Sequence, residues 1–420
     1  MDLSRQASVA GQSNDRGDRA GSRTETALSV KLYVLFWLVG AYLRIPVLAV
    51  PPLIPLMRRD LALSETVVSL LTTLPVLLFA LAAVLGSYLI ARLGARRTLV
   101  WGLVLLGAGA ALRGAYPAVW FIIAATFVMG VGIAIAQPAL PTLVGLWCPE
   151  RVGQATAVYT NGLLVGELLG AALTAPVIVP LAGASWRLAF VAWALPVALI
   201  AYATGVMRAS ASPPQTTVKT AGATWWPDWK SGRTWLVGLT LTASSSPYFC
   251  ANAFLPDYLR ATGHPELLSL ALGLLNGSQA LASFIVMSLA GRLIGRRLPF
   301  FLAALGAFLP LVALGFHPGG GAILALSSLI GFCTSLVFIL GLALPPILSS
   351  PEQTHLLSAA MFAINYLCAF LTPLLGGLAW DLTGISATAF LPASLIVLAS
   401  LVAIRAVDLR PYRQYENKSA

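Results

Sequence analysis

Long runs of apolar residues, separated by short polar segments, extend from about residue 31 to residue 407. Each run is close to the roughly 20 residues that an α-helix needs to cross the hydrocarbon core of a bilayer. A helix satisfies its own backbone hydrogen bonds, so it is the element expected for such runs in lipid. The pattern predicts an all-α membrane protein with twelve transmembrane helices, at residues 31–56, 65–91, 98–116, 118–145, 155–181, 187–207, 234–258, 267–290, 299–316, 321–348, 356–380 and 385–407.

Composition supports this prediction. Only 10% of the 420 residues are charged, against about 25% in an ordinary soluble domain, so a water-exposed surface cannot be covered. The four cysteines are far apart and form no C-x-x-C pair. They are expected to be free thiols, with no disulfide framework and no metal site.

The basic residues predict the orientation. The net charge is +11, but Lys and Arg lie between the apolar runs and form no single patch, which argues against nucleic acid as a partner. If both termini are cytoplasmic, 20 of the 26 Lys and Arg residues fall on inner segments and 4 on outer ones. Cytoplasmic segments carry this excess in membrane proteins. We expect a multi-pass protein of the inner (cytoplasmic) cell membrane, with both termini in the cytoplasm.

A polar stretch divides the twelve helices into two groups of six. The expected parts are a disordered cytoplasmic tail at 1–30, an N-terminal bundle at 31–207, a cytoplasmic linker at 208–233, a C-terminal bundle at 234–407 and a cytoplasmic tail at 408–420. The basic loop Arg92–Arg97 is echoed by Gly291–Arg297 at the equivalent place in the second group. This echo indicates a parallel repeat of two six-helix halves, as some transporter folds have.

Two ionisable side chains lie near the middle of predicted spans, Arg44 in the first and Glu167 in the fifth. A charge there costs about 2.5–3.5 kcal/mol on insertion scales, so a compensating role is expected. The guanidinium of Arg44 suits an anionic substrate, and a buried ion pair with Glu167 is the structural alternative. Glu167 is the candidate for proton coupling, and a permanently paired carboxylate is its alternative. Arg113 is a further substrate-binding candidate, although it can also extend to the outer interface.

Uncharged polar residues inside the spans are candidates for lining a substrate cavity. Each of them can equally form a hydrogen bond between helices. The candidates are Tyr42, Gln137, Asn161, Tyr248, Asn252, Asn276, Gln279, Asn365 and Tyr366.

Prolines inside the first, fourth and tenth spans predict bent or broken helices. Non-helical backbone at membrane depth is tolerated only against protein or water, so these three helices are expected to line the cavity. The prolines are Pro46, Pro51, Pro52, Pro55, Pro138, Pro141, Pro345 and Pro346.

Several catalytic motifs are missing. The sequence contains no G-x-x-x-x-G-K-[ST] loop for ATP, no H-E-x-x-H pair for zinc and no G-x-S-x-G nucleophile elbow. We therefore expect neither an enzyme nor an ATP-driven pump, and no cofactor.

The residues resemble the cyanate/2-nitroimidazole transporter branch of the major facilitator superfamily. The similar stretches span both halves, roughly residues 31–407, and the resemblance implies the major facilitator fold. It also implies small anions such as cyanate as substrates of some members and export of nitroaromatic compounds by others. The stretches are Leu43-Arg44 with Pro51–Pro55, Leu71–Val76, Ala155–Glu167, Trp186-Arg187, Leu344–Pro346, Ser358–Ile364 and Trp380–Gly384.

This sequence departs from the family pattern at three places. Tyr42-Leu43-Arg44-Ile45 stands where the family often has Asn-Leu-Arg-Pro, Ala91 where a superfamily signature expects aspartate, and Ser244–Ser246 where relatives often have an amide. These changes bear on the substrate more than on the fold.

The sequence features fit one function best, and two others less well. We expect a secondary transporter that moves a small organic or inorganic anion, cyanate-like, by alternating access, with a proton as coupling ion and the site between the halves. The alternative is a proton-coupled exporter of nitroaromatic or other toxic small molecules, in which Arg44 is paired and structural. A membrane sensor or scaffold is disfavoured because tails of about 30 and 13 residues are too short to fold. We expect a monomer in the lipid bilayer.

Overall fold

The computed structural model describes residues 30–61, 63, 65–207 and 224–411, and all regular elements among them are helices. We call residues 30–207 the first half. Its elements are a helix at residues 30–42, α2 (Ile45–Leu48), α3 (Val50–Leu61), α4 (Glu65–Leu81), α5 (Ala83–Leu93), α6 (Ala95–Leu112), α7 (Val119–Trp147), α8 (Val152–Leu173), the π-helical turn η1 (Thr174–Ile178), α9 (Val179–Leu181) and α10 (Trp186–Val206).

Residues 224–411 form the second half. Its elements are α11 (Gly232–Ala261), the 3₁₀ turn η2 (Pro265–Leu267), α12 (Leu268–Leu293), α13 (Arg297–Leu314), α14 (Gly320–Leu342), α15 (Leu344–Leu348), α16 (Thr354–Thr383), the 3₁₀ turn η3 (Ser386–Phe390) and α17 (Leu391–Ala406). Every predicted span coincides with one of these helices or with consecutive helices, with small shifts at the ends. The predicted tail at 1–30 and linker at 208–233 lie mostly outside the described residues, as does most of the tail at 408–420.

Ten helices or helix groups of the described chain are long and apolar enough to cross a membrane, and the bent pair of α4 and α5 makes eleven. The remaining long helix is α11, which has 30 residues but carries Thr240, Thr242 and Ser244–Ser246 in its middle. It packs among α14, α16 and α17 of the same bundle. By position and length α11 is therefore the twelfth span.

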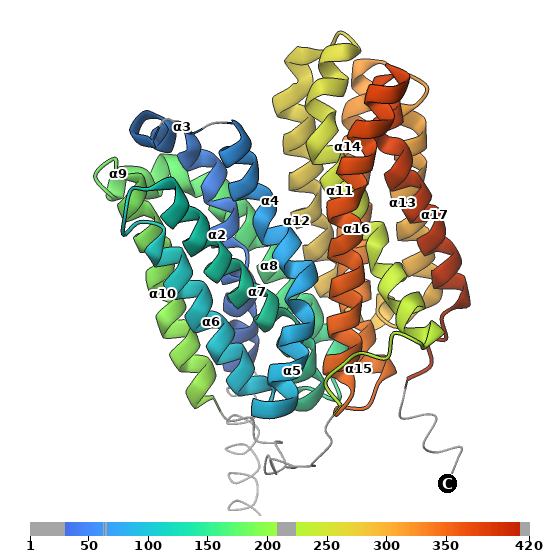
Figure 1. Ribbon diagram of the computed structural model, residues 1–420. Coiled ribbons are helices and arrows are strands. Elements are labelled where there is room, and N and C mark those ends of the chain that lie inside the picture. The colour runs from blue at the N-terminus through green and yellow to red at the C-terminus, as the bar shows by residue number, and fades with distance from the viewer. Residues whose placement is uncertain (1–29, 62, 64, 208–223, 412–420) are drawn as a thin grey trace, which may run out of the picture.

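The two halves lie side by side and approach each other at one end (Figure 1). We call this end, where α5 leads into α6 and α12 into α13, the termini face. There the hydroxyl of Ser87 in α5 donates to the backbone carbonyl of Trp225 (2.8 Å), and the ring of Tyr88 packs edge-on against the Trp225 ring. Ala157 and Leu164 of α8 pack in a cluster with α12 and α14. The halves are thus closed against each other at the termini face and diverge toward the opposite face (Figure 1).

The echoed basic loops have matching structures in the two halves. Gly94 and Gly295 both have positive φ values, 83° and 77°, which glycine adopts without a Cβ clash. Just after them, Arg96 donates to the carbonyl of Met207 (3.2 Å) and Arg297 to that of Val407 (2.8 Å). Each arginine therefore ties the third helix of its half to the end of the sixth.

The outer surface of the bundle is apolar. On α10, Leu195, Leu199 and Tyr202 are exposed at spacings of three or four residues, and on α17 Leu395 and Val402 are exposed. A patch of this kind on a soluble monomer would promote association. Against lipid tails these side chains need no further cover.

The expected helix breaks are found in two of the three predicted spans. The first span is interrupted at residues 43–44 and again at Ala49, and the tenth at Ala343, just before Pro345 and Pro346. In the fourth span α7 continues through Pro138 and Pro141, so no break is found there. A 49° bend between α4 and α5 was not predicted, since no proline lies at Ala82.

Three glycines of α8 bring its backbone against the first span. A Cβ built on Gly162, Gly166 or Gly170 would collide with the backbone carbonyl oxygen of Trp37, Ala41 or Ile45, respectively. We call this line of contacts the glycine seam. Small residues spaced by four allow such close approach of membrane helices. The seam fixes the depth and rotation of residues 37–45 against α8, and Arg44 and Glu167 lie within it.

Replacing Gly166 with alanine is expected to destabilise the protein by about 1–3 kcal/mol, the usual cost of overpacking, because the new methyl group would press on the carbonyl of Ala41. The measurement is the midpoint of thermal unfolding in detergent. Gly277→Ala in α12 is the control, because no atom lies within 4 Å of a Cβ built there. Equal midpoints for the two variants would contradict a tight seam.

Candidate functional site

Arg44 is positioned by the break in the first span. The helix of residues 30–42 ends in a turn, and Arg44 is the residue that precedes the short helix α2, with Pro46 in its first turn. The carbonyl of Arg44 accepts hydrogen bonds from the backbone of Val47 and Leu48. The guanidinium lies in the interior, and the residue is only 6% exposed.

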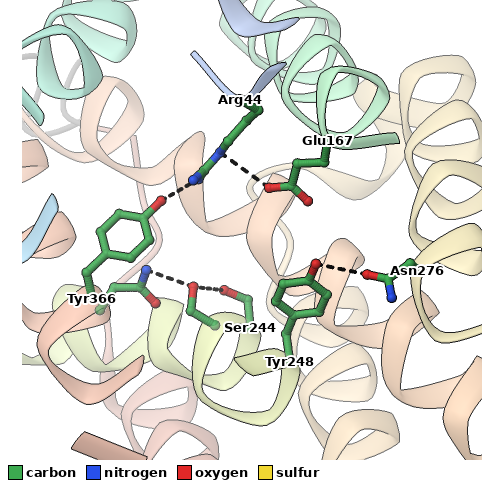
Figure 2. Close-up of polar contacts among 8 residues, drawn as sticks. Arg44, Glu167, Ser244, Tyr248, Asn276 and Tyr366 are labelled. Carbon is green, nitrogen blue, oxygen red and sulfur yellow. Dashed lines mark hydrogen bonds and ion pairs between the residues drawn. The ribbon is translucent and has the colours of Figure 1, made fainter. Parts of the chain in front are cut away.

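Three kinds of contact compensate the Arg44 charge. Its Nε lies 3.4 Å from Oε1 of Glu167 on α8, and its Nη2 donates to the hydroxyl of Tyr366 on α16 (2.6 Å). The guanidinium carbon also lies 5.3 Å from the ring centroid of Phe79, within cation–π range. Figure 2 shows Glu167 and Tyr366 on opposite sides of the guanidinium. Glu167 belongs to the first half and Tyr366 to the second, so Arg44 joins the halves.

A chain of amides holds Tyr248 in the facing wall. The Tyr248 hydroxyl donates to Oδ1 of Asn276 on α12 (2.9 Å), and the Asn276 amide donates to Oδ1 of Asn252 (3.2 Å). The Asn252 amide donates in turn to the backbone carbonyl of Tyr248 (2.9 Å). This closed ring of bonds joins α11 to α12, and the Tyr248 ring lines the cavity. Figure 2 shows the bond between Tyr248 and Asn276.

These side chains surround a cavity between the halves, which we call the Arg44 cavity. Its free volume is about 30 Å³. Helices of both halves contribute to its wall. The lining residues are Arg44, Leu164, Glu167, Ser244, Ser245, Tyr248, Phe249, Gln279, Thr334, Phe338 and Tyr366.

The structure brings five of the predicted candidates together in this cavity: Arg44, Glu167, Tyr248, Gln279 and Tyr366. A sixth, Gln137, lines a smaller neighbouring cavity. Asn252 supports Tyr248 from behind, as described above. The remaining candidates make other contacts.

Asn161 and Asn365 serve as links between helices. Asn161 accepts from the Trp37 indole (2.8 Å) and donates to Ser283 on α12 (2.9 Å). Asn365 on α16 donates to the hydroxyl of Ser245 on α11 (2.9 Å). Neither amide lines a described cavity.

Arg113 and Tyr42 also lie away from the Arg44 cavity. Arg113 does not extend to the outer interface, since it is only 1% exposed. It donates to the carbonyl of Pro46 in α2 (2.8 Å) and lies 4.3 Å from the ring centroid of Phe190. Tyr42 packs, half-buried, on a cluster that contains Trp193. Both residues support the broken first span.

Sequence reasoning missed several lining residues. In the sequence, Ser244 and Ser245 stand out only as a departure from the family pattern, and Leu164, Phe249 and Phe338 are apolar residues like many others in the spans. Thr334 gives a weak signal, because it is a polar residue inside an apolar span. It lies one helical turn before Phe338, on the same face of α14. Among the described residues no group of three or more His, Cys, Asp or Glu side chains is placed to hold a metal ion.

Comparison with known proteins gives the family. The model of the Major Facilitator Superfamily matches residues 34–264, more than half of the chain. The chain belongs to the Major Facilitator Superfamily. Its members are transporters and not enzymes, so this chain is a multi-pass secondary transporter, and the predicted fold class is confirmed.

The similar proteins narrow the branch of the superfamily. The chain is 29% identical to the cyanate transport protein CynX of Escherichia coli (strain K12), over 60% of this chain and 65% of that protein. It is 28% identical to the 2-nitroimidazole transporter of the same organism, over 83% of this chain and 87% of that one. The crystal structure of the transporter FucP in the outward conformation superposes with a TM-score of 0.70 at 14% identity, over 89% of this chain and 98% of that chain. The last likeness shows a common fold.

Replacing Tyr366 with phenylalanine is expected to lower the midpoint of thermal unfolding of the unliganded protein. It removes a hydrogen bond to a charged group, typically worth about 1.5–3 kcal/mol, and keeps the ring that stacks on Phe362. Tyr33→Phe is the control, since that hydroxyl makes a longer, exposed bond to Gln154 within the first half (3.3 Å). Equal effects would show that Arg44 does not depend on Tyr366.

Proposed function

We propose that this transporter moves a small anion through the Arg44 cavity, with Arg44 as the cation that binds it. The observation that supports this proposal most directly is the long distance between the guanidinium of Arg44 and the carboxylate of Glu167. Charge-assisted N–H···O bonds are usually about 2.7–2.9 Å long, whereas Nε of Arg44 lies 3.4 Å from Glu167 and makes no hydrogen bond. A guanidinium with an unused donor beside a cavity suits an anion better than a closed structural pair does.

The size of the cavity favours a small cargo. A cavity of about 30 Å³ is small, which favours a cargo of a few non-hydrogen atoms. Cyanate is a linear anion of this size. The similarity to the cyanate transport protein, which covers part of both chains, points to the same substrate class.

The similarity to the 2-nitroimidazole transporter supports a second candidate, export of nitroaromatic compounds. The rings of Tyr248, Phe249 and Phe338 line the cavity and offer flat apolar surfaces to an aromatic solute. A nitroimidazole has about eight non-hydrogen atoms and needs a wider cavity than a three-atom anion does. We therefore place the small anion first.

Proton coupling would follow from the position of Glu167. Its carboxylate competes with an incoming anion for Arg44, and its side chain is 20% exposed, toward the cavity. Protonation of Glu167 would remove the competing charge, so the anion and the proton would bind together. Entry of both moves no net charge into the site.

The two halves would act as the moving units of alternating access, which in this fold rock about a central site. With both termini cytoplasmic, as the Lys and Arg bias indicates, the closed termini face is the inner face and the cavity communicates with the outside. This orientation, location in the inner cell membrane and a monomeric state are parts of the proposal. A fluorescent protein fused to the C-terminus, which matures in the cytoplasm, checks the orientation.

Substitution of Arg44 with alanine is expected to lower cyanate uptake into proteoliposomes by at least about 10-fold, since a lost charge-assisted contact of 1.4 kcal/mol or more has that effect on binding. Arg44→Lys is also expected to be impaired, because an ammonium lacks the planar fork. The control is Arg260→Gln, an exposed arginine paired with Asp257. Normal cyanate uptake by Arg44→Ala, or uptake of 2-nitroimidazole and not of cyanate by the parent protein, would contradict the anion proposal.

Substitution of Glu167 with glutamine is expected to separate anion movement from the proton. The amide mimics the protonated carboxyl group, so exchange of internal for external cyanate at equal pH should persist. Stimulation of uptake by an acidic exterior should be lost, because the amide cannot take up a proton. Asp257→Asn is the matched control for a carboxylate outside the cavity. An unchanged response to the pH gradient would exclude Glu167 as the coupling residue.

A further inference from the structure

A second, smaller cavity adjoins the Arg44 cavity. It shares Arg44, Phe338 and Tyr366 as walls and adds Gln137 of α7 and Tyr159 of α8. We call it the Gln137 chamber. Helices α8 and α16 both begin at the termini face. Tyr159, eight residues before Glu167 on α8, and Phe362, four residues before Tyr366 on α16, therefore lie nearer to that face. The chamber is therefore the continuation of the Arg44 cavity toward the termini face.

Polar atoms in this chamber lack partners. Gln137 is 4% exposed, and neither its amide nitrogen nor its amide oxygen makes a hydrogen bond in the described chain. The Tyr159 hydroxyl, on a residue 1% exposed, also makes no hydrogen bond of ordinary geometry. Buried polar side chains nearly always have partners, so unpaired ones facing a cavity call for an explanation.

The chemistry of the chamber suits an anion. Its polar groups are the Gln137 amide, the phenols of Tyr159 and Tyr366 and the shared guanidinium, all of which can donate hydrogen bonds. Glu167 lines the Arg44 cavity but is not among the residues around the Gln137 chamber. An anion that moves from one space to the other keeps Arg44 as a neighbour and leaves the competing carboxylate behind.

The chamber is too small for the anion in the present conformation. Its free volume is about 10 Å³, against about 30 Å³ for the Arg44 cavity. Its walls come from both halves, with Gln137 and Tyr159 on one side and Phe338, Phe362 and Tyr366 on the other. Separation of the halves at the termini face would widen it and break the bond from Arg44 to Tyr366.

We propose that the Gln137 chamber is a second binding site for the transported anion, occupied after Tyr366 releases Arg44 and before the anion leaves at the termini face. The identity of the anion rests on the function proposed above. The site itself rests on the unpaired Gln137 and Tyr159. In the present conformation the anion binds in the Arg44 cavity, and the amide of Gln137 becomes a ligand only as the termini face opens.

The test compares binding and transport in Gln137→Leu and Tyr159→Phe, with radiolabelled cyanate as the probe. Equilibrium binding to purified protein is expected to stay within about 2-fold of the parent, while uptake and exchange in proteoliposomes fall by about 10-fold, since each 1.4 kcal/mol changes an equilibrium tenfold. Thr126→Val on α7 is the control. It also removes a buried, unpaired hydroxyl, but Thr126 lines neither cavity. Unchanged transport in both chamber variants would overturn the proposal, as would a loss of binding equal to that of Arg44→Ala.

A measurement that needs no cargo separates this proposal from the function above. Because the Gln137 amide is unpaired, Gln137→Leu is expected to leave the midpoint of thermal unfolding unchanged or raised. A fall of the midpoint would mean that Gln137 stabilises the fold, and the chamber proposal would be wrong whatever the cargo. If the parent protein neither binds nor transports cyanate while Gln137→Leu remains stable, the assigned anion is wrong, and the same comparison is made with thiocyanate and nitrate.

Discussion

The burial of one guanidinium governs the architecture of this transporter. A charged side chain at membrane depth needs compensation, and Arg44 receives it from a carboxylate, a phenol and an aromatic face. These partners come from three different helices, so the positions of α4, α8 and α16 are linked through one side chain. The break at residues 43–44 turns Arg44 inward, and the glycine seam holds it beside Glu167.

The contacts of Arg44 differ in which half of the protein they reach. The pair of Arg44 and Glu167 lies within the first half, whereas the bond to Tyr366 crosses to the second. Movement of one half against the other can therefore break the phenol contact and leave the ion pair together. On the side of Tyr366 that faces the termini lie Gln137 and Tyr159. Their polar groups make no hydrogen bond while the halves are closed.

The sequence was sufficient to predict the spans and the central charges, because the physics behind both is independent of detailed packing. Apolar runs must become helices in lipid, and Arg44 and Glu167 are costly in any arrangement of those helices. The same reasoning could not separate amides that line a cavity from amides that bond a neighbouring helix. Asn161 and Asn365 lie as deep as Gln137 but bond neighbouring helices, and the difference depends on side-chain direction.

Backbone irregularities were predictable only in part. Pro46 and the pair Pro345-Pro346 accompany real breaks, yet α7 stays continuous through Pro138 and Pro141, where Thr142 donates to the carbonyl of Pro138 (2.8 Å). The bend at Ala82 lacks a local sequence cause. The aromatic residues Phe249 and Phe338 became part of the site only through the meeting of the two halves, which periodicity within one helix does not reveal.

The glycine seam also has an electrical consequence. Because it joins the helix of residues 30–42 to α8 backbone to backbone, Arg44 and Glu167 travel together as a pair with no net charge. A lone charge that crosses the membrane field changes its energy by about 2.3 kcal/mol per 100 mV. For the neutral pair these contributions cancel, so in the proposed cycle the membrane voltage would not favour either orientation of the empty carrier.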